Sequence, residues 1–265
     1  MARCDSLGPL DLHIWLCRRE RVANSSQFSR EILTRYAPVA PDDWQFRVGK
    51  HGKPHIANSS IALDFNLSHS RDWLVCAVTA SGAIGVDIEY CEPAREFNKL
   101  ARRFFQPQEY EALQTLPAAA RSARFYDLWT LKEARVKASG GALGNQLSSL
   151  GFALSSPAAG SGQSSPGEIL EAPAPTLSDT GSLVIAGENA SFGEGGYSPK
   201  EARSPEEAHY SLFALPGDYR LAICALRTLP GSPQLELYEW LGRDDVRPAC
   251  YTVRAQSSTL RCNTE

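Results

Sequence analysis

Hydrophobic and polar residues alternate in several short runs in the first half of the chain, as in β-strands with one buried face. The clearest run is AIGVDIEY at 83–90, in which Val86 and Ile88 point to one side and Asp87 and Glu89 to the other. The runs that predict strands cover 11–17, 61–67, 73–79 and 83–89. A short turn with one glycine joins the last two runs as a hairpin.

A period of 3.6 residues predicts three helices. The first covers 25–36, beginning at serine caps and ending before Pro38, and the second covers 107–116. The third runs from about residue 122 to a pair of glycines, Gly140 and Gly141, which end helices readily.

The third helix places a lysine on its apolar side. Phe125, Leu128, Trp129 and Val136 form one stripe, and Lys132 projects from its middle. An ammonium in that position loses hydration worth several kcal/mol unless an anion compensates it. The pattern therefore predicts an anion beside Lys132, unless the side chain extends to the edge of the stripe and into solvent.

The second half contains strand-like runs at 147–154, 209–215 and 219–226, the last two forming a hairpin through a Pro-Gly-Asp turn. Between them, Ser, Gly, Pro and Ala make up 19 of the 28 residues of 155–182. Such a composition buries too little apolar surface to fold, so we predict a flexible insertion over about 155–208. The tail, 228–265, carries one amphipathic stretch, LELYEWL, and is expected to be loosely held. The predicted organisation is an N-terminal half over 1–100, a C-terminal half over 101–227, and this tail.

Composition and charge narrow the function only slightly. The 265 residues are 43% apolar and 22% charged, as in a soluble globular protein, and the net charge of −3 predicts neither nucleic acid nor a membrane as a partner. Seven cysteines without CxxC or Cys/His spacing give no metal signature. Without a signal peptide or a long apolar run, we expect a cytoplasmic protein with reduced thiols.

Four groups of residues could carry chemistry. Asp87 and Glu89 share one strand face, which suits a hard cation such as Mg²⁺, although a solvated polar face has the same alternation. Ser68 and His69 come where a strand is predicted to end, as functional residues often do, although a capping serine and a surface histidine would look alike.

The segment RVGKHGKPH at 47–55 concentrates basic residues around two glycines, which suits an anion but also a solvated loop. On the third helix, Glu133 and Lys137 are spaced as an ordinary surface pair. Alternatively, Lys132, Glu133 and Lys137 together border a cleft that holds a polyanion and its metal.

Taken together, GKP (52–54), NLSHS (66–70), GVDIE (85–89) and WTLKEARVK (129–137) resemble the 4′-phosphopantetheinyl transferases. The similarity is to the longer monomeric type that activates surfactin synthetase, and it covers about 10–155 and the hairpin at 209–226. It implies an α+β fold, a pseudo-dimer of two similar α/β halves with the active site in the cleft between them. It also implies transfer of the phosphopantetheine arm of coenzyme A to a serine of a carrier protein, releasing adenosine 3′,5′-bisphosphate.

The resemblance further implies roles for individual residues. Asp87, Glu89 and Glu133 would hold Mg²⁺, with Glu133 also the candidate general base, a metal-bound water being the alternative. Lys132 and Lys137 would bind the phosphates of coenzyme A. The remaining ligands would be Ser68 and His69 at phosphates, Lys53 and Pro54 beside the nucleotide, and Arg30 at the adenosine end.

The expected partners are apo acyl, peptidyl or aryl carrier proteins, and the expected state is a monomer. Two other functions stay open at this point. One is a non-catalytic relative that binds a carrier protein or a nucleotide. The other is a different Mg²⁺-dependent transferase that cleaves a pyrophosphate.

Overall fold

The computed structural model describes residues 6–92, 96–154, 167–172, 207–227, 233–256 and 261–262. These residues form two six-stranded sheets, a small separate hairpin and a few helices, so the mixed α and β composition predicted from the sequence is confirmed. Within these ranges, every helix is too short or too polar to span a bilayer.

The first sheet combines strands from both ends of the chain. Its order is β12-β11-β1-β5-β4, and β14 also pairs with β11. The strands are β1 (Asp11–Arg18), β4 (Asp64–Ser70), β5 (Trp73–Thr79), β11 (Gln234–Gly242), β12 (Asp245–Pro248) and β14 (Arg261–Cys262). β1 is antiparallel to β5 and parallel to β11.

The second sheet has the order β6-β10-β9-β13-β8-β7. Its strands are β6 (Ala83–Tyr90), β7 (Gly151–Leu154), β8 (Gly167–Ala172), β9 (Glu207–Leu215), β10 (Tyr219–Arg227) and β13 (Thr252–Gln256). β6 therefore belongs to a different sheet from β5, which precedes it directly in the chain. The first sheet combines strands of the predicted N-terminal half and of the tail, whereas the second combines strands of both predicted halves and of the tail.

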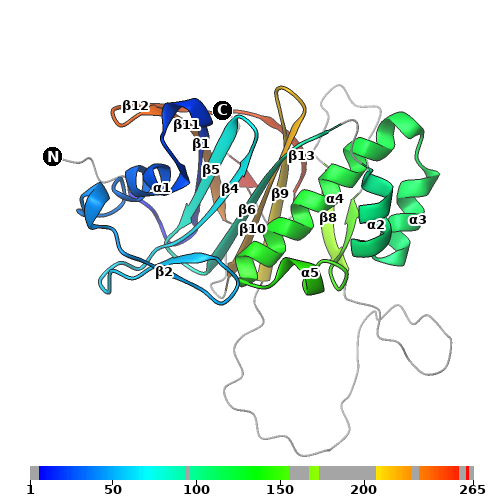
Figure 1. The fold of residues 1–265 in the computed structure, drawn as a ribbon, viewed down its shortest axis with the longest axis horizontal. Coiled ribbons are helices and arrows are strands. Elements are labelled where there is room, and N and C mark those ends of the chain that lie inside the picture. Colours follow the sequence, from blue (N-terminus) through cyan, green and yellow to red (C-terminus); the bar gives the residue numbers. More distant parts are fainter. Residues whose placement is uncertain are drawn as a thin grey trace, which may run out of the picture.

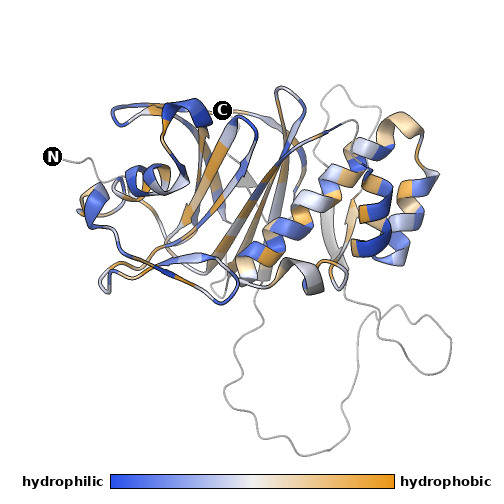
Figure 2. Cartoon of the chain, viewed as in Figure 1, coloured by the Kyte–Doolittle hydropathy of each residue, from blue (hydrophilic) through white to orange (hydrophobic). Residues whose placement is uncertain are grey.

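Helices cover the outer faces of the two sheets (Figure 1). They are α1 (Ser25–Leu33) on one side, and α2 (Phe97–Phe104), α3 (Pro107–Thr115), α4 (Ala118–Ser139) and α5 (Leu143–Gln146) on the other. One apolar cluster lies between α1 and the first sheet, and another between α4 and the second sheet. A third joins the facing sides of both sheets, for example Ile14 and Val75 with Val86 and Ile223. Hydrophobic residues accordingly concentrate along the strands, and hydrophilic ones on the outward turns of α1 and α2 (Figure 2).

Side chains of β4 connect the two sheets. Asp64, Asn66, Ser68 and Ser70 each accept a hydrogen bond from a backbone amide of β6, at Ile84, Val86, Ile88 and Tyr90 in turn. The donor–acceptor distances are 2.9, 2.9, 3.2 and 2.9 Å. Because side chains alternate along a strand, every second residue of β4 faces β6, and the row forms a side-chain ladder in place of a backbone one.

The C-terminal tail is not loosely held over its described part, 233–256. β11 pairs with β1 in the first sheet, and β13 pairs with β9 in the second. Leu235 and Leu237 enter the core between the sheets, so the stretch read as an isolated amphipathic segment is a strand with one buried side. The tail prediction was therefore wrong here, because the partners of β11 and β13 are distant in sequence.

Other boundaries also differ from the sequence predictions. The strand predicted at 61–67 runs as β4 through Ser70, and the basic segment 47–55 forms a hairpin of β2 (Phe46–Val48) and β3 (Pro54–Ile56). α2 was not predicted. Of the predicted insertion, β8 pairs with β7 and β13, whereas 155–166 and 173–206 lie outside the described residues.

Replacing Asn66 with leucine tests the side-chain ladder. The variant keeps the side-chain volume but leaves the buried amide of Val86 without its acceptor, which costs about 1–3 kcal/mol. Chemical denaturation should show this loss. Asn98→Leu, an exposed change on α2, should alter the free energy of unfolding by less than about 0.5 kcal/mol and serves as the control. Equal effects of the two substitutions would contradict a stabilising role of the ladder.

Candidate active site

A glycine on β6 lets α4 approach the second sheet closely. A Cβ atom at Gly85 would lie 2.1 Å from the carbonyl oxygen of Ala134 and 2.4 Å from the amide nitrogen of Ala138. Only a residue without a side chain fits there. This contact brings the turn of α4 that carries Glu133 and Lys137 against the polar face of β6.

Three carboxylates meet at this contact. Asp87 and Glu89 project from β6 and Glu133 projects from α4, with one carboxylate oxygen of each within 4.8 Å of the others. Asp87 is buried, whereas Glu89 and Glu133 are partly exposed. Like charges at this separation repel one another, so the cluster needs cations to stabilise it.

Lys137 supplies one such cation from the same protein. Its ammonium donates to Asp87 Oδ1 at 2.6 Å and lies 3.9 Å from Glu133 Oε2. Burial on its own lowers the pKa of Lys137, but attraction to Asp87 and then Glu133 outweighs it, so that the pKa is raised above its ordinary value. Lys137 is therefore positively charged at neutral pH.

Ser68 connects the carboxylate cluster to the side-chain ladder. Its hydroxyl donates to Asp87 Oδ1 at 2.9 Å and accepts from the Lys137 ammonium at 3.1 Å. Oδ1 of Asp87 is thus fully engaged, while its Oδ2 is buried without a hydrogen-bond partner. Buried carboxylate oxygens without partners are rare, and a bound ion is one explanation for them.

The donor set fits a hard divalent cation. Three carboxylates within reach of one point, one of them with a free buried oxygen, offer the oxygen ligands that Mg²⁺ prefers. Neither cysteine nor histidine belongs to this group, so softer metals are disfavoured. Asp87, Glu89 and Glu133 would hold the ion.

The structure corrects the predicted role of Lys132 as a phosphate ligand. This lysine is fully buried, and its ammonium lies 2.7 Å from Glu109 Oε2 of α3. It also donates to the carbonyl oxygens of Leu147 and Leu150. Burial lowers the pKa of Lys132, and the Glu109 carboxylate opposes that shift. An ammonium enclosed by three acceptors is not directed at a ligand, so Lys132 does not border a phosphate cleft.

The other partner of this ion pair was not predicted. Glu109 also accepts from the amides of Gln106 at 2.8 Å and Phe152 at 2.7 Å. It therefore joins the start of α3, the middle of α4 and β7. In the sequence PQEY, a glutamate follows a proline within the first helical turn. This pattern predicts a helix cap, but it does not predict an ion pair with a lysine distant in sequence.

The remaining predicted residues lie apart from the carboxylates. Lys53 is buried and binds Asp64 Oδ2 at 2.8 Å and the carbonyl oxygen of Ile84 at 2.9 Å, next to the ladder. Pro54 follows it at the start of β3. His69 is exposed and faces away from Ser68 on β4, within the strand and not at its end.

Arg30 lies on α1, on the outer side of the first sheet. Its guanidinium donates to the carbonyl oxygens of Pro41 at 2.9 Å and Trp44 at 2.8 Å. It borders a polar surface pocket together with Gln27, Asp42 and other residues of that side. Its predicted contact with adenosine stays a prediction.

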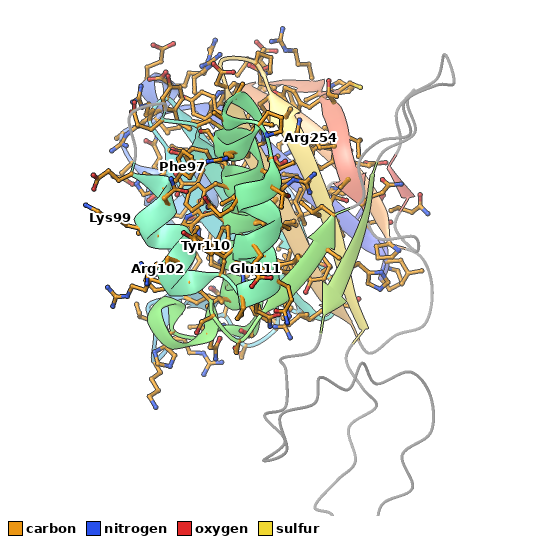
Figure 3. All side chains as sticks on the ribbon, turned by 90° about the vertical axis from the view of Figure 1, so that its right-hand side faces the viewer. Phe97, Lys99, Arg102, Tyr110, Glu111 and Arg254 are labelled. Carbon is orange, nitrogen blue, oxygen red and sulfur yellow. The ribbon has the colours of Figure 1, made fainter. Side chains whose placement is uncertain are left out.

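A second cationic group lies beside Glu89. Asp127 of α4 accepts from Arg220 Nε at 2.9 Å, and Arg254 of β13 binds it with two hydrogen bonds, of 2.9 and 2.8 Å. Arg220 is the cross-strand partner of Glu89 on β10. Figure 3 shows α2, α3 and α4 in front of the second sheet, with Arg254 beside α4.

Comparisons with known proteins agree on one family. Residues 83–180 match the family model described as the 4′-phosphopantetheinyl transferase superfamily. The chain is 40% identical over 124 residues to the 4′-phosphopantetheinyl transferase HetI of Nostoc sp., which covers 46% of this chain and 52% of that protein. It is 34% identical over 125 residues to the 4′-phosphopantetheinyl transferase Sfp of Bacillus subtilis, which covers 47% and 54%. The chain thus spans about half the length of these relatives.

One solved structure with a similar outline is a holo-(acyl-carrier-protein) synthase from Bacillus anthracis in complex with CoA (3′,5′-ADP). It shares 13% sequence identity and a TM-score of 0.34, over 55% of this chain and 96% of that one.

Alanine at position 85 should separate α4 from β6. The added Cβ would overlap the α4 backbone, so we expect a loss of at least about 3 kcal/mol in unfolding free energy, the upper end for overpacked cores. Gly144→Ala is the control, because nothing lies within 4 Å of a Cβ at that position. Thermal and chemical denaturation of both variants measure the difference. A Gly85→Ala protein of ordinary stability would show that the close approach is not required.

Lys132→Met should destabilise the fold by about 3–5 kcal/mol, because Glu109 would remain as a buried charge without its cation. Combining it with Glu109→Gln removes that charge and should recover a large part of the loss. Denaturation of the two single variants and the double variant gives the coupling energy. Additive effects would contradict the ion pair.

Proposed function

We propose that the chain is a member of the 4′-phosphopantetheinyl transferase superfamily, whose family model matches residues 83–180, and that it transfers the 4′-phosphopantetheine arm of coenzyme A to a serine of a carrier protein. The observation that supports this proposal is the cluster of Asp87, Glu89 and Glu133 with Lys137 beside it. The reaction displaces adenosine 3′,5′-bisphosphate from the pyrophosphate of coenzyme A. Its chemistry requires charge compensation for phosphate oxygens and removal of one proton.

Asp87, Glu89 and Glu133 would hold Mg²⁺. When bound, Mg²⁺ supplies charge stabilisation at the phosphate oxygens of the substrate. The free buried oxygen of Asp87 supports this assignment, because a cation there would satisfy it. The three carboxylates would then no longer repel one another.

Lys137 would stabilise the negative charge that develops on the leaving bisphosphate. Its raised pKa keeps it protonated at neutral pH, and about one fifth of its side chain is accessible to solvent. A cation held in place before the reaction costs no reorganisation when the charge develops. Its carboxylate partners fix its position while the substrate is absent.

Glu133 would take the proton of the carrier serine as the serine oxygen attacks the β-phosphorus. The carboxylate lies on α4 at the accessible side of the cluster, with its side chain 14% exposed. A hydroxyl is a weak nucleophile at neutral pH, so a positioned base contributes to the rate. We also propose contacts of coenzyme A with His69, Arg30, Pro54, Ser68 and Lys53, of which Ser68 and Lys53 are buried in the structure.

The partners would be apo carrier proteins, with the chain acting as a cytoplasmic monomer. Cys17, Cys76, Cys91 and Cys250 are free thiols in the described part of the chain, which suits a reducing compartment. We also propose that the active site lies in a cleft between two similar halves. The carboxylates lie where β4, β6 and α4 meet, which is a junction of the two sheets.

Asp87→Asn tests the proposal. The amide keeps an oxygen for Ser68 but removes one metal-binding charge, so transfer should fall by at least the 10–100-fold seen when metal sites lose supporting residues. Mass spectrometry of acyl, peptidyl and aryl carrier proteins incubated with coenzyme A and Mg²⁺ measures the gain of one phosphopantetheine arm. Glu111→Gln, an exposed carboxylate on α3, is the control and should stay within twofold of wild type.

If the wild-type chain modifies none of the carriers, the transferase assignment is wrong. If Asp87→Asn matches wild type at saturating Mg²⁺, the metal-ligand role is wrong although the reaction stands.

A further inference from the structure

Trp129 contacts the carboxylate cluster through its only polar atom. The indole is 6% exposed, and its Nε1 donates to Glu89 Oε1 at 3.2 Å. A buried tryptophan packs by its ring and needs an acceptor for its N–H. Here the acceptor is a carboxylate of the candidate metal site.

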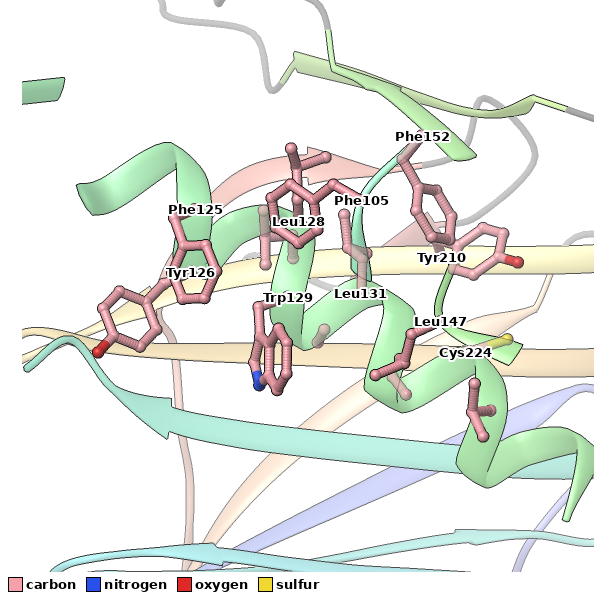
Figure 4. Close-up of a cluster of buried hydrophobic side chains, with 14 of the residues drawn as sticks. Phe105, Phe125, Tyr126, Leu128, Trp129, Leu131, Leu147, Phe152, Tyr210 and Cys224 are labelled. Atoms are coloured by element: carbon pink, nitrogen blue, oxygen red, sulfur yellow. The ribbon is translucent and has the colours of Figure 1, made fainter. Parts of the chain in front are cut away.

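Aromatic neighbours fix the indole ring. Phe125 stacks on it with ring centroids 5.6 Å apart, and Phe104 of α2 meets it edge-on at 5.7 Å. Figure 4 shows Trp129 in this cluster, with its indole nitrogen on the side of β6. The ring therefore has little freedom to change direction.

The backbone around Trp129 is also fixed. Asp127, two residues earlier on α4, binds Arg254 of β13 and Arg220 of β10. Arg220 is the cross-strand partner of Glu89, so Asp127 joins α4 to the strand that pairs with β6. The helix that carries the donor and the strand that carries the acceptor are therefore also connected through β10.

We propose that Trp129 is a positioning residue for Glu89, which fixes this carboxylate so that it faces Asp87 and Glu133. The inference rests on the proposed metal site. A glutamate has several rotatable bonds, so ordering its side chain costs conformational entropy. Because the rigid indole N–H orders the Glu89 side chain in the folded protein, the side chain does not have to be ordered when the cation binds. Residues that orient metal ligands in this way typically change metal affinity 10–100-fold when replaced.

The test is Trp129→Phe, which keeps an aromatic ring among Phe104 and Phe125 but has no N–H. The affinity of the full-length protein for Mn²⁺, titrated by electron paramagnetic resonance, should fall about tenfold. In transfer assays the KM for Mg²⁺ should rise accordingly, and kcat at saturating Mg²⁺ should change much less.

Two comparisons separate positioning from packing. Phe104→Leu removes a ring contact of Trp129 and keeps its N–H, so it should lower the melting temperature and leave Mn²⁺ affinity within twofold. In a Glu89→Ala background, Trp129→Phe should have no further effect on Mn²⁺ affinity, because the side chain that the indole positions is gone.

If Trp129→Phe does not fold, benzothienylalanine at position 129 replaces it, since this residue has the size of tryptophan without the donor. Mn²⁺ affinity equal to wild type in either variant overturns the proposal. The proposal is also overturned if Trp129→Phe lowers Mn²⁺ affinity equally with and without the Glu89 carboxylate. A wild-type chain that binds no Mn²⁺ would instead refute the proposed metal site itself.

Discussion

The hydrogen bonds from β6 amides to β4 side chains are the contact on which the relation of the two sheets depends. β6 is paired by its backbone to β10 along one edge only, and along the other edge its amides are satisfied by Asp64, Asn66, Ser68 and Ser70. An unsatisfied buried amide costs about 1–3 kcal/mol, whereas a domain has a net stability of about 5–15 kcal/mol. Four such losses together would therefore be comparable with the whole stability of the fold. This explains why a strand at the junction carries a polar side chain at every second position.

The same contact prepares the site. Ser68 belongs to the ladder through the Ile88 amide and to the carboxylate cluster through Asp87. Gly85, on β6 with Asp87, lets the α4 backbone approach closely and so brings Glu133 and Lys137 to the site. The side-chain ladder and Gly85 fix neighbouring residues of β6. The position of the carboxylates therefore follows directly from how the two sheets and α4 are joined. A mutation in the joint would alter the site without touching a carboxylate.

The sequence predicted the parts of the site that depend on local periodicity. Alternation along β6 placed Asp87 and Glu89 on one face, and helical spacing placed Lys132 on the buried side of α4; both placements agree with the structure. It also predicted correctly that a buried ammonium needs an anion. The identity of that anion, Glu109, depends on how α3 packs on α4, and no local pattern encodes this. The strands at 233–256 were missed for the same reason, since their pairing partners lie in other parts of the chain. The roles of individual residues toward coenzyme A and Mg²⁺ remain predictions.

The pairing of β11 with β1 has a consequence for biosynthesis. β1 emerges from the ribosome with one side available to β5, while its other neighbour begins at residue 234. Until then the nascent first sheet exposes the backbone groups of β1 along an open edge, which is the kind of edge that pairs with other chains. Contacts between residues so far apart in sequence also form slowly, because the closure entropy of the intervening chain opposes them. The exposure of this edge during synthesis would thus last until β11 is released to pair with β1.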